Sequence, residues 1–400
     1  MFIDSYLRSH GTNLSQLTAL VKEYLNPEEP EIIYFTGSLV EGLGNFKSDI
    51  DIYLISDRDF NDRLTCDSII IITLATCFID VEILSFDQVN KLVERLNKFP
   101  SNEERDQRTT LAFTLPELKF LHNLRIAQPL FGEASFFELT SKVNKEALSR
   151  ILFDRSIVSA DSLQIDILGL IEDGDSLSAR YLLGHYLGHL CSAFLSALGD
   201  TNPAEKWRVR KLNELRRADV SVPLPRRKSF DEIVDMFSNL HVQCEPNLIA
   251  VKDAFSQMLH LSRLIIPWGQ SRFLSGTSLR AHSYQSVAEV NHQRITEDRQ
   301  GGAEEMLFDL SINESKAVLP QLNLNCRIRY NNQDFKLSHL HSTKTFNINW
   351  LAYELLLLFN GSTTLEEAVR HLKGISPAAN HEILDTIYDF KTFLQHYDFI

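Results

Sequence analysis

Two acidic residues, Asp49 and Asp51, stand one residue apart in a short run rich in isoleucine. In a β-strand, residues i and i+2 lie on the same face, so both carboxylates would point the same way while Ile50 and Ile52 point into a core. Two carboxylates on one face repel each other unless a cation lies between them, and Mg²⁺ prefers oxygen ligands of this kind. The spacing therefore indicates a magnesium site.

A Gly-Ser pair, Gly37 and Ser38, follows the preceding hydrophobic run. Glycine lets the backbone approach a phosphate closely, and the serine hydroxyl and N–H can donate hydrogen bonds to it. A later run, Cys77–Leu84, again carries two carboxylates at i and i+2, Asp80 and Glu82. If this run is a strand beside the first, either carboxylate supplies the third acidic group of a two-metal site.

The competing interpretation is an acidic sheet edge next to a Gly-Ser turn. An Asp-x-Asp spacing alone is common and does not separate the two interpretations. The full order is more specific: a strand, Gly-Ser, a short step, an Asp-x-Asp strand and a second acidic strand. That order favours a site with chemical function.

The elements that must position these residues alternate between helix and strand over residues 1–104. Apolar residues at helical spacing predict a helix over Leu14–Tyr24, and Asn26–Pro30 then breaks it. Runs rich in β-branched and aromatic residues predict strands at Glu31–Thr36, Asp51–Ser56, Ser68–Leu74 and Cys77–Leu84. This alternation indicates an α+β domain, with α/β as the alternative.

Residues 105–269 carry apolar stripes at helical spacing with few β-type runs, which predicts an all-α helical bundle. Residues 270–317 lose this periodicity and are rich in Ser, Gln, Arg, His and Gly, which is typical of a linker. Residues 318–400 form a third unit, in which Cys326–Tyr330 and Phe335–Ser338 flank a turn signal at Asn331–Asn332. Three helical patterns follow that hairpin.

The Gly-Ser, Asp-x-Asp and second acidic strand resemble the signature of the polymerase-β-like nucleotidyltransferase superfamily over about residues 30–90, with the helical bundle extending to about residue 265. The resemblance implies that Gly37 and Ser38 hold a nucleoside triphosphate. It also implies that Asp49 and Asp51 bind two Mg²⁺ ions. Asp80 would bind one of these ions and act as a base.

The third carboxylate has two candidates in this pattern, since Asp80 and Glu82 share a face. Asp80 is preferred because it takes the first acidic position of the strand, as the superfamily pattern has it. In the bundle, Lys206 beside Trp207 looks similar to the segment that faces the triphosphate in several relatives. The surrounding segment Lys206–Lys228 is basic, which indicates either a solvated helix face or a wall for the triphosphate or an acidic acceptor.

Residues of about 320–400 resemble PqqD-like domains, small winged-helix-like α+β units that recognise leader peptides during ribosomal-peptide maturation. The sequence features that carry this resemblance are the strand ending in Asn347, the helix from Trp350, and Asn360-Gly361 before the helix that contains Glu366-Glu367. The resemblance implies that a peptide adds a strand to an exposed sheet edge. The alternative is a winged helix used only for packing or dimerisation.

Composition narrows the class of protein and the cellular compartment that fit this site. The 400 residues carry a net charge of −13, which argues against general nucleic-acid binding. The five cysteines are scattered and never stand in a CxxC spacing, which favours a reducing cytoplasm over a disulfide scaffold or structural zinc. No apolar run is long enough to span a membrane, and the first residues lack the pattern of a secretory signal.

Three functions remain open on this basis. The first is a nucleotidyltransferase that moves a nucleoside monophosphate to an acceptor hydroxyl or peptide, with the acceptor docked by the PqqD-like domain. The second keeps the chemistry but uses an aminoglycoside-like small molecule as acceptor. The third is a non-catalytic, antitoxin-like or regulatory binding protein, which the intact carboxylates argue against.

Overall fold

The computed structural model describes most of the chain, and the description is restricted to these residues: 2–60, 64, 69–74, 77–99, 112–217, 230–240, 245, 247–275, 316–331, 334–340, 345–376, 378 and 380–400. The chain divides into two compact units. The first comprises Met1–Arg155 and Leu198–Ala218, and the second comprises Ser156–Ala197 and Asp219–Ile400. Each unit is therefore built from two separate stretches of sequence.

The first unit contains one mixed five-stranded sheet with helices on both faces. Its strand order is β3-β4-β2-β1-β5, with β2 parallel to β4 and antiparallel to β1. In chain order its elements are α1 (Phe2–Ser9), α2 (Leu14–Leu25), β1 (Ile32–Thr36), α3 (Ser38–Glu41), β2 (Ile50–Ile55), β3 (Ile69–Leu74), β4 (Cys77–Leu84), α4 (Phe86–Asn97), α6 (Leu115–Ile126), β5 (Gln128–Phe131), α7 (Glu133–Ser141), the 3-10 turn η2 (Glu205–Trp207) and α10 (Arg208–Arg217).

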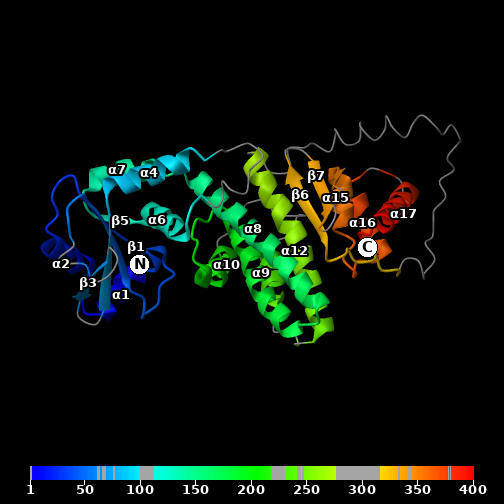
Figure 1. Cartoon of the computed structure of the whole chain (residues 1–400), viewed down its shortest axis with the longest axis horizontal. Helices are drawn as coiled ribbons and strands as arrows, with labels where there is room; N and C mark the ends of the chain where they lie inside the picture. Colours follow the sequence, from blue (N-terminus) through cyan, green and yellow to red (C-terminus); the bar gives the residue numbers. More distant parts are fainter. Residues whose placement is uncertain are drawn as a thin grey trace. The chain divides into compact units, whose positions relative to one another are not determined.

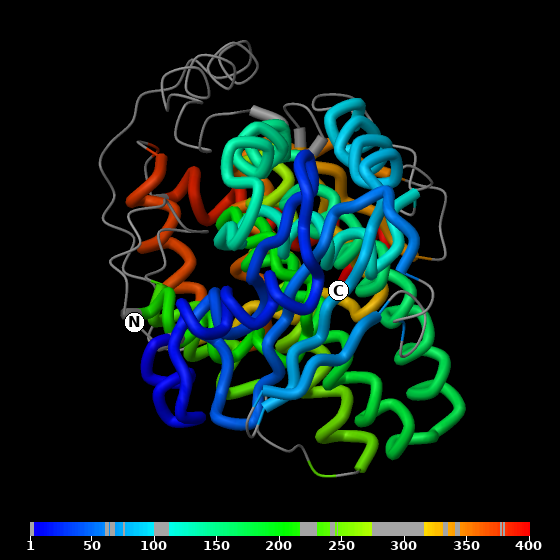
Figure 2. The backbone as a smooth tube through the Cα atoms, turned by 90° about the vertical axis from the view of Figure 1, so that its left-hand side faces the viewer, coloured from blue at the N-terminus to red at the C-terminus, as the bar shows by residue number. Residues whose placement is uncertain are grey.

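The alternation of side chains along the central strands builds a core on each face of the sheet. On one face Ile33, Phe35 and Ile52 pack with residues of α1 and α2. On the other face Tyr34 and Tyr53 pack under α4, α6 and α7, and their rings stack with centroids 5.4 Å apart. Figures 1 and 2 show α1 and α2 on one side of the strands and α4 and α7 on the other.

The second unit combines long helices with a small sheet. Its helices include most of α8 (Lys145–Glu172), then α9 (Ser176–Ala197), α11 (Phe230–Leu240) and α12 (Leu248–Ser275). An antiparallel sheet of order β6-β7-β8 follows, formed by β6 (Cys326–Asn331), β7 (Asp334–His339) and β8 (Thr345–Ile348), with α15 (Trp350–Leu356), α16 (Leu365–Lys373) and α17 (Asn380–His396). Figure 1 shows this sheet beside α12 and the last three helices.

Most elements predicted from periodicity are confirmed. The strands at 31–36, 51–56, 68–74 and 77–84 correspond to β1–β4, and the predicted hairpin is β6–β7, although the turn residues 332–333 lie outside the described residues. The mixture of helix and strand with a helical bundle is also confirmed. In the described part of the chain, no helix is both long and apolar enough to cross a bilayer.

The compact units group the chain differently from the four expected ranges 1–104, 105–269, 270–317 and 318–400. Helices α6 and α7 pack on the first sheet because their apolar side chains complete its core. The expected linker lies mostly outside the described residues, and residues 270–275 belong to α12.

Strand β6 packs onto the long helices through polar contacts at its outer edge. The backbone N–H of Tyr330 donates to Gln270 Oε1 at 2.8 Å, and Arg263 donates to the Cys326 carbonyl at 3.2 Å. Arg327 and Arg329 both contact Asp161 of α8. Side chains of α12 therefore hydrogen-bond the outer backbone groups of β6, for which the sequence pattern predicts no partner.

Candidate active site

The pairing of β2 with β4 brings two of the predicted carboxylates together. In the parallel register Asp51 lies opposite Asp80, and in the antiparallel register with β1 it lies opposite Thr36. Ile50 and Ile52 are fully buried in the core on the other face, as predicted. Asp49 is exposed and directly precedes β2.

The electrostatics of this face show that four acidic side chains influence one another. Burial raises the pKa of Asp51 to about 6; Lys119 opposes this effect, while Glu82, Asp80 and Asp49 add to it. Burial also raises the pKa of Asp80, again with Asp49 and Glu82 acting in the same direction. The negative charge on this face of the sheet is only partly balanced by Lys119, and a bound cation would reduce the repulsion between the carboxylates.

A divalent cation suits these donors because hard oxygen ligands are what Mg²⁺ prefers. Asp51 and Asp80 fit this role, since their strands hold them side by side. Within the described residues, however, no group of three or more His, Cys, Asp or Glu side chains lies close enough to hold a metal ion. The structure thus assembles a pair of carboxylates, with Asp49 and Glu82 near enough to shift their pKa values.

Glu82 has a different environment from Asp80. It lies opposite Tyr53 in the β2–β4 ladder and one of its carboxylate oxygens lies 3.6 Å from Lys119 Nζ. Burial and the nearby Glu82 both raise the pKa of the Tyr53 hydroxyl. Glu82 therefore already has a cationic partner in Lys119, whereas Asp80 lies beside Asp51.

Lys119 is a site residue that the sequence did not single out. It lies on α6 and acts on Asp51, Asp80 and Glu82. Its helix was predicted, but the local pattern does not indicate which side of that helix faces the sheet.

Gly37 occupies a backbone position that only glycine can take. Its φ is 78° and its ψ is −162°, and an ideal Cβ added to it would lie 2.0 Å from Asp51 Oδ2. The backbone then turns through α3, where the Ser38 carbonyl accepts hydrogen bonds from the N–H groups of Leu43 and Gly44 at 2.8 Å each. The glycine predicted to approach a phosphate thus also passes directly against a candidate metal ligand.

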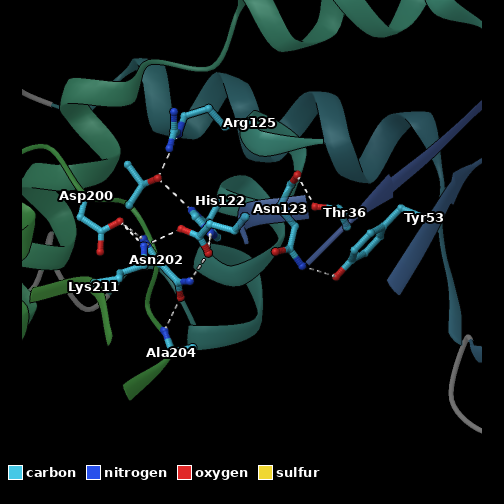
Figure 3. Close-up of polar contacts among 11 residues, drawn as sticks. Thr36, Tyr53, His122, Asn123, Arg125, Asp200, Asn202, Ala204 and Lys211 are labelled. Atoms are coloured by element: carbon cyan, nitrogen blue, oxygen red, sulfur yellow. Dashed lines mark hydrogen bonds and ion pairs between the residues drawn. The ribbon is translucent and has the colours of Figure 1, made fainter. Parts of the chain in front are cut away.

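A charged network centred on Glu41 holds this turn. Lys211 Nζ lies 2.5 Å from carboxylate oxygens of both Glu41 and Asp200, and Asn202 donates to Glu41 at 2.6 Å. Figure 3 shows Lys211, Asp200 and Asn202 grouped in this way beside His122. Burial raises the pKa of Glu41, but hydrogen bonds and charges from His122 and Lys211 outweigh it and lower the pKa to about 2. Glu41 is therefore an ionised, internally paired carboxylate.

Arg210 fixes the other end of the same turn. Its guanidinium donates to the backbone carbonyls of Gly42, Leu43 and Gly44 at 3.0, 2.8 and 3.1 Å. Helix α10 thus contributes Arg210 and Lys211 to the turn that follows Gly37.

The predicted nucleotide-binding lysine, Lys206, lies in the 3-10 turn that precedes α10. Lys206 is exposed in η2, with its Nζ 5.1 Å from the centroid of the Trp207 ring. The buried lysine of the basic segment is Lys211, and residues 218–228 of that segment lie outside the described residues. A nucleotide-binding role for Lys206 stays a prediction.

Comparisons with known proteins add little to this geometry. No protein family model matches the chain, and no curated protein matches it. Among solved structures, a nucleotidyltransferase-like protein from Exiguobacterium sibiricum is similar over 72% of this chain and 81% of its own, with 16% sequence identity and a TM-score of 0.35. A similarity of this size does not by itself assign a fold or an activity.

The contact between Gly37 and Asp51 predicts unequal effects for two glycine substitutions in one turn. Gly42 also has a positive φ, of 83°, but an added Cβ would meet nothing within 4 Å. Gly42→Ala should cost about 1–2 kcal/mol of unfolding free energy from its backbone conformation alone. Gly37→Ala should cost at least about 2 kcal/mol more, because its backbone conformation is closed to alanine and the added Cβ would clash with Asp51. Chemical denaturation measures both, and equal losses would contradict the close approach.

The raised pKa of Asp51 predicts the pH dependence of the metal-free protein. Ionisation is disfavoured in the folded state, so the contribution of Asp51 to stability is present below its ordinary pKa of 3.8 and is lost as the pH rises to about 6. In EDTA at pH 8, Asp51→Asn should be more stable than wild type by up to about 3 kcal/mol. The difference should vanish near pH 3. A variant less stable than wild type at pH 8 would show that the carboxylate is stabilised rather than strained.

Proposed function

We propose that the chain is a Mg²⁺-dependent nucleotidyltransferase that moves a nucleoside monophosphate from a nucleoside triphosphate to an acceptor hydroxyl. The observation that carries this proposal is the β2–β4 register, which puts Asp51 beside Asp80 on one face next to the Gly37 turn. An acidic pair with a raised pKa beside a glycine turn suits a phosphate-bound cation better than a structural role does.

Asp49, Asp51 and Asp80 would hold the metal ions, which neutralise charge on the phosphates when bound. Asp80 would accept the proton of the acceptor hydroxyl as its oxygen attacks the α-phosphorus. The bond from that phosphorus to the bridging oxygen breaks, and pyrophosphate leaves. Glu82 is better suited to position Lys119, since it already contacts that side chain.

The triphosphate would lie against the turn at Gly37 and Ser38. The Ser38 hydroxyl is half-buried and has no hydrogen-bond partner among the described residues, so it is available to a ligand. The Ser38 carbonyl, in contrast, is held by two backbone N–H groups of the turn. Lys206 remains a proposed contact from the exposed side of η2.

A peptide partner would dock at the β8 edge of the second sheet, because the β6 edge is covered by α12. On β6, the backbone groups that point away from β7 belong to Cys326 and Tyr330. Because the hydrogen-bonding direction alternates along each strand, the registers of β6 with β7 and of β7 with β8 leave the N–H of Asn347 pointing away from β7. No described strand pairs with that edge. Two alternatives would replace this part of the proposal. The acceptor is a small molecule, or the chain is a binding protein without catalytic activity.

Asp49→Asn and Asp51→Asn should each reduce pyrophosphate release from all four nucleoside triphosphates by at least about a hundredfold, because each removes a charged metal ligand. Asp80→Asn should lower kcat more than it raises KM, since a base acts in the transition state. The exposed Asp87→Asn, on α4, is the matched control and should be unaffected. Wild-type activity in Asp51→Asn would overturn the proposal. An inactive Glu82→Gln variant together with an active Asp80→Asn variant would assign the metal-binding and base roles to Glu82 instead of Asp80.

Asn347→Pro tests the peptide edge, because it removes one outward N–H while sparing the bonds to β7. Asn347→Ala keeps that N–H and is the control. Peptides selected from a random display library on the wild-type chain should bind Asn347→Ala and be lost from Asn347→Pro. Equal binding to both variants would place the peptide elsewhere.

A further inference from the structure

Arg125 lies in the last turn of α6 and is held at only one of its donor atoms. Its Nε donates to Thr201 Oγ1 at 3.0 Å, and the structure gives its terminal amino groups no hydrogen bond to any described residue. The side chain is half-buried, and Figure 3 shows it at the margin of the polar network. A guanidinium fixed in this way presents two free amino groups in a set direction.

The hydroxyl that holds Arg125 is itself fixed by a buried chain of hydrogen bonds. Thr201 is fully buried, and its Oγ1 lies 2.9 Å from His122 Nδ1. The other ring nitrogen, Nε2, lies 3.3 Å from a carboxylate oxygen of Glu41. Since an ionised carboxylate only accepts, Nε2 carries a proton and donates to Glu41. The Thr201 oxygen, held by Nδ1 of the same ring, accepts from Arg125 Nε.

The same contacts place Arg125 near the proposed triphosphate turn. The Thr36 hydroxyl donates to the Asn123 carbonyl at 2.6 Å, and Glu41 contacts His122. Thr36 and Glu41 are the residues on either side of Gly37–Val40. The turn is therefore attached at both ends to α6, within three residues of Arg125.

We propose that Arg125 binds the non-bridging oxygens of the triphosphate and of the pyrophosphate that leaves, and that Thr201 and His122 are positioning residues for it. This proposal rests on the proposed function. Two parallel N–H donors match the geometry of a phosphate group, which a single lysine does not provide.

The competing role for Arg125 is to balance buried negative charge. Glu41 and Asp200 both act on it, but each already has Lys211 at 2.5 Å and neither hydrogen-bonds the guanidinium in the described structure. Charge balance alone would need neither the orienting hydroxyl nor the free amino groups. The two roles differ in what a substitution changes: ligand affinity or folding stability.

Calorimetry of the full chain with Mg²⁺ and inorganic tripolyphosphate tests this directly. Arg125→Gln should raise the Kd about tenfold or more, the loss expected for a charged hydrogen bond. Arg125→Lys should recover part of that loss. Thr201→Val should raise the Kd with little change in kcat, and Thr201→Ser should restore it. The exposed Arg8→Gln, on α1, removes the same charge from the same unit and should bind as wild type.

The outcomes separate this inference from the proposed function. If wild type binds tripolyphosphate and folded Arg125→Gln and Thr201→Val bind it equally well, Arg125 is structural and the inference fails while the function stands. If wild type binds neither tripolyphosphate nor any of the four triphosphates, the proposed function fails and the inference with it. If Arg125→Gln does not fold, the Thr201→Val and Thr201→Ser pair decides alone.

Discussion

Parallel pairing of β2 with β4 places Asp51 directly beside Asp80, and the repulsion between these two carboxylates is the constraint on which the rest of the site depends. A one-residue change of register would move Asp80 to the other face, away from Asp51. Ile79 and Val81, which alternate with Asp80 along β4, oppose such a change because they would leave the core that they share with α1 and α2. Core packing thus sets the position of the acidic pair.

The turn after β1 is held from a distant part of the sequence. Arg210 and Lys211 reach back to the segment between Gly37 and Gly44, one through backbone carbonyls and the other through Glu41. Carbonyl contacts fix the path of the backbone, while the ion pair fixes a side chain. The Ser38 hydroxyl of this turn has no hydrogen-bond partner among the described residues, and its residue is half-buried.

Local patterns predicted the strands and the face of each strand that carries carboxylates, because alternation and Asp-x-Asp spacing report on single elements. They did not predict Lys119, His122, Arg125 or Lys211, whose importance comes from which element each one faces. Nor did they predict that α12 covers β6, since an edge strand looks the same in sequence whether water or a helix lies beside it. Pairings of this kind depend on tertiary packing, which one sequence read locally does not contain.

The first unit is closed by a segment that returns from far along the chain, since Leu198–Ala218 joins Met1–Arg155. Lys211 follows Glu41 by 170 residues, so during synthesis the acidic partner emerges from the ribosome long before its lysine. Until then the sheet of the first unit can form, but the turn after Gly37 has neither Arg210 nor Lys211 to hold it. The site is therefore assembled late, and a fragment that ends at Arg155 would contain every candidate metal ligand without the clamp that orders the neighbouring turn.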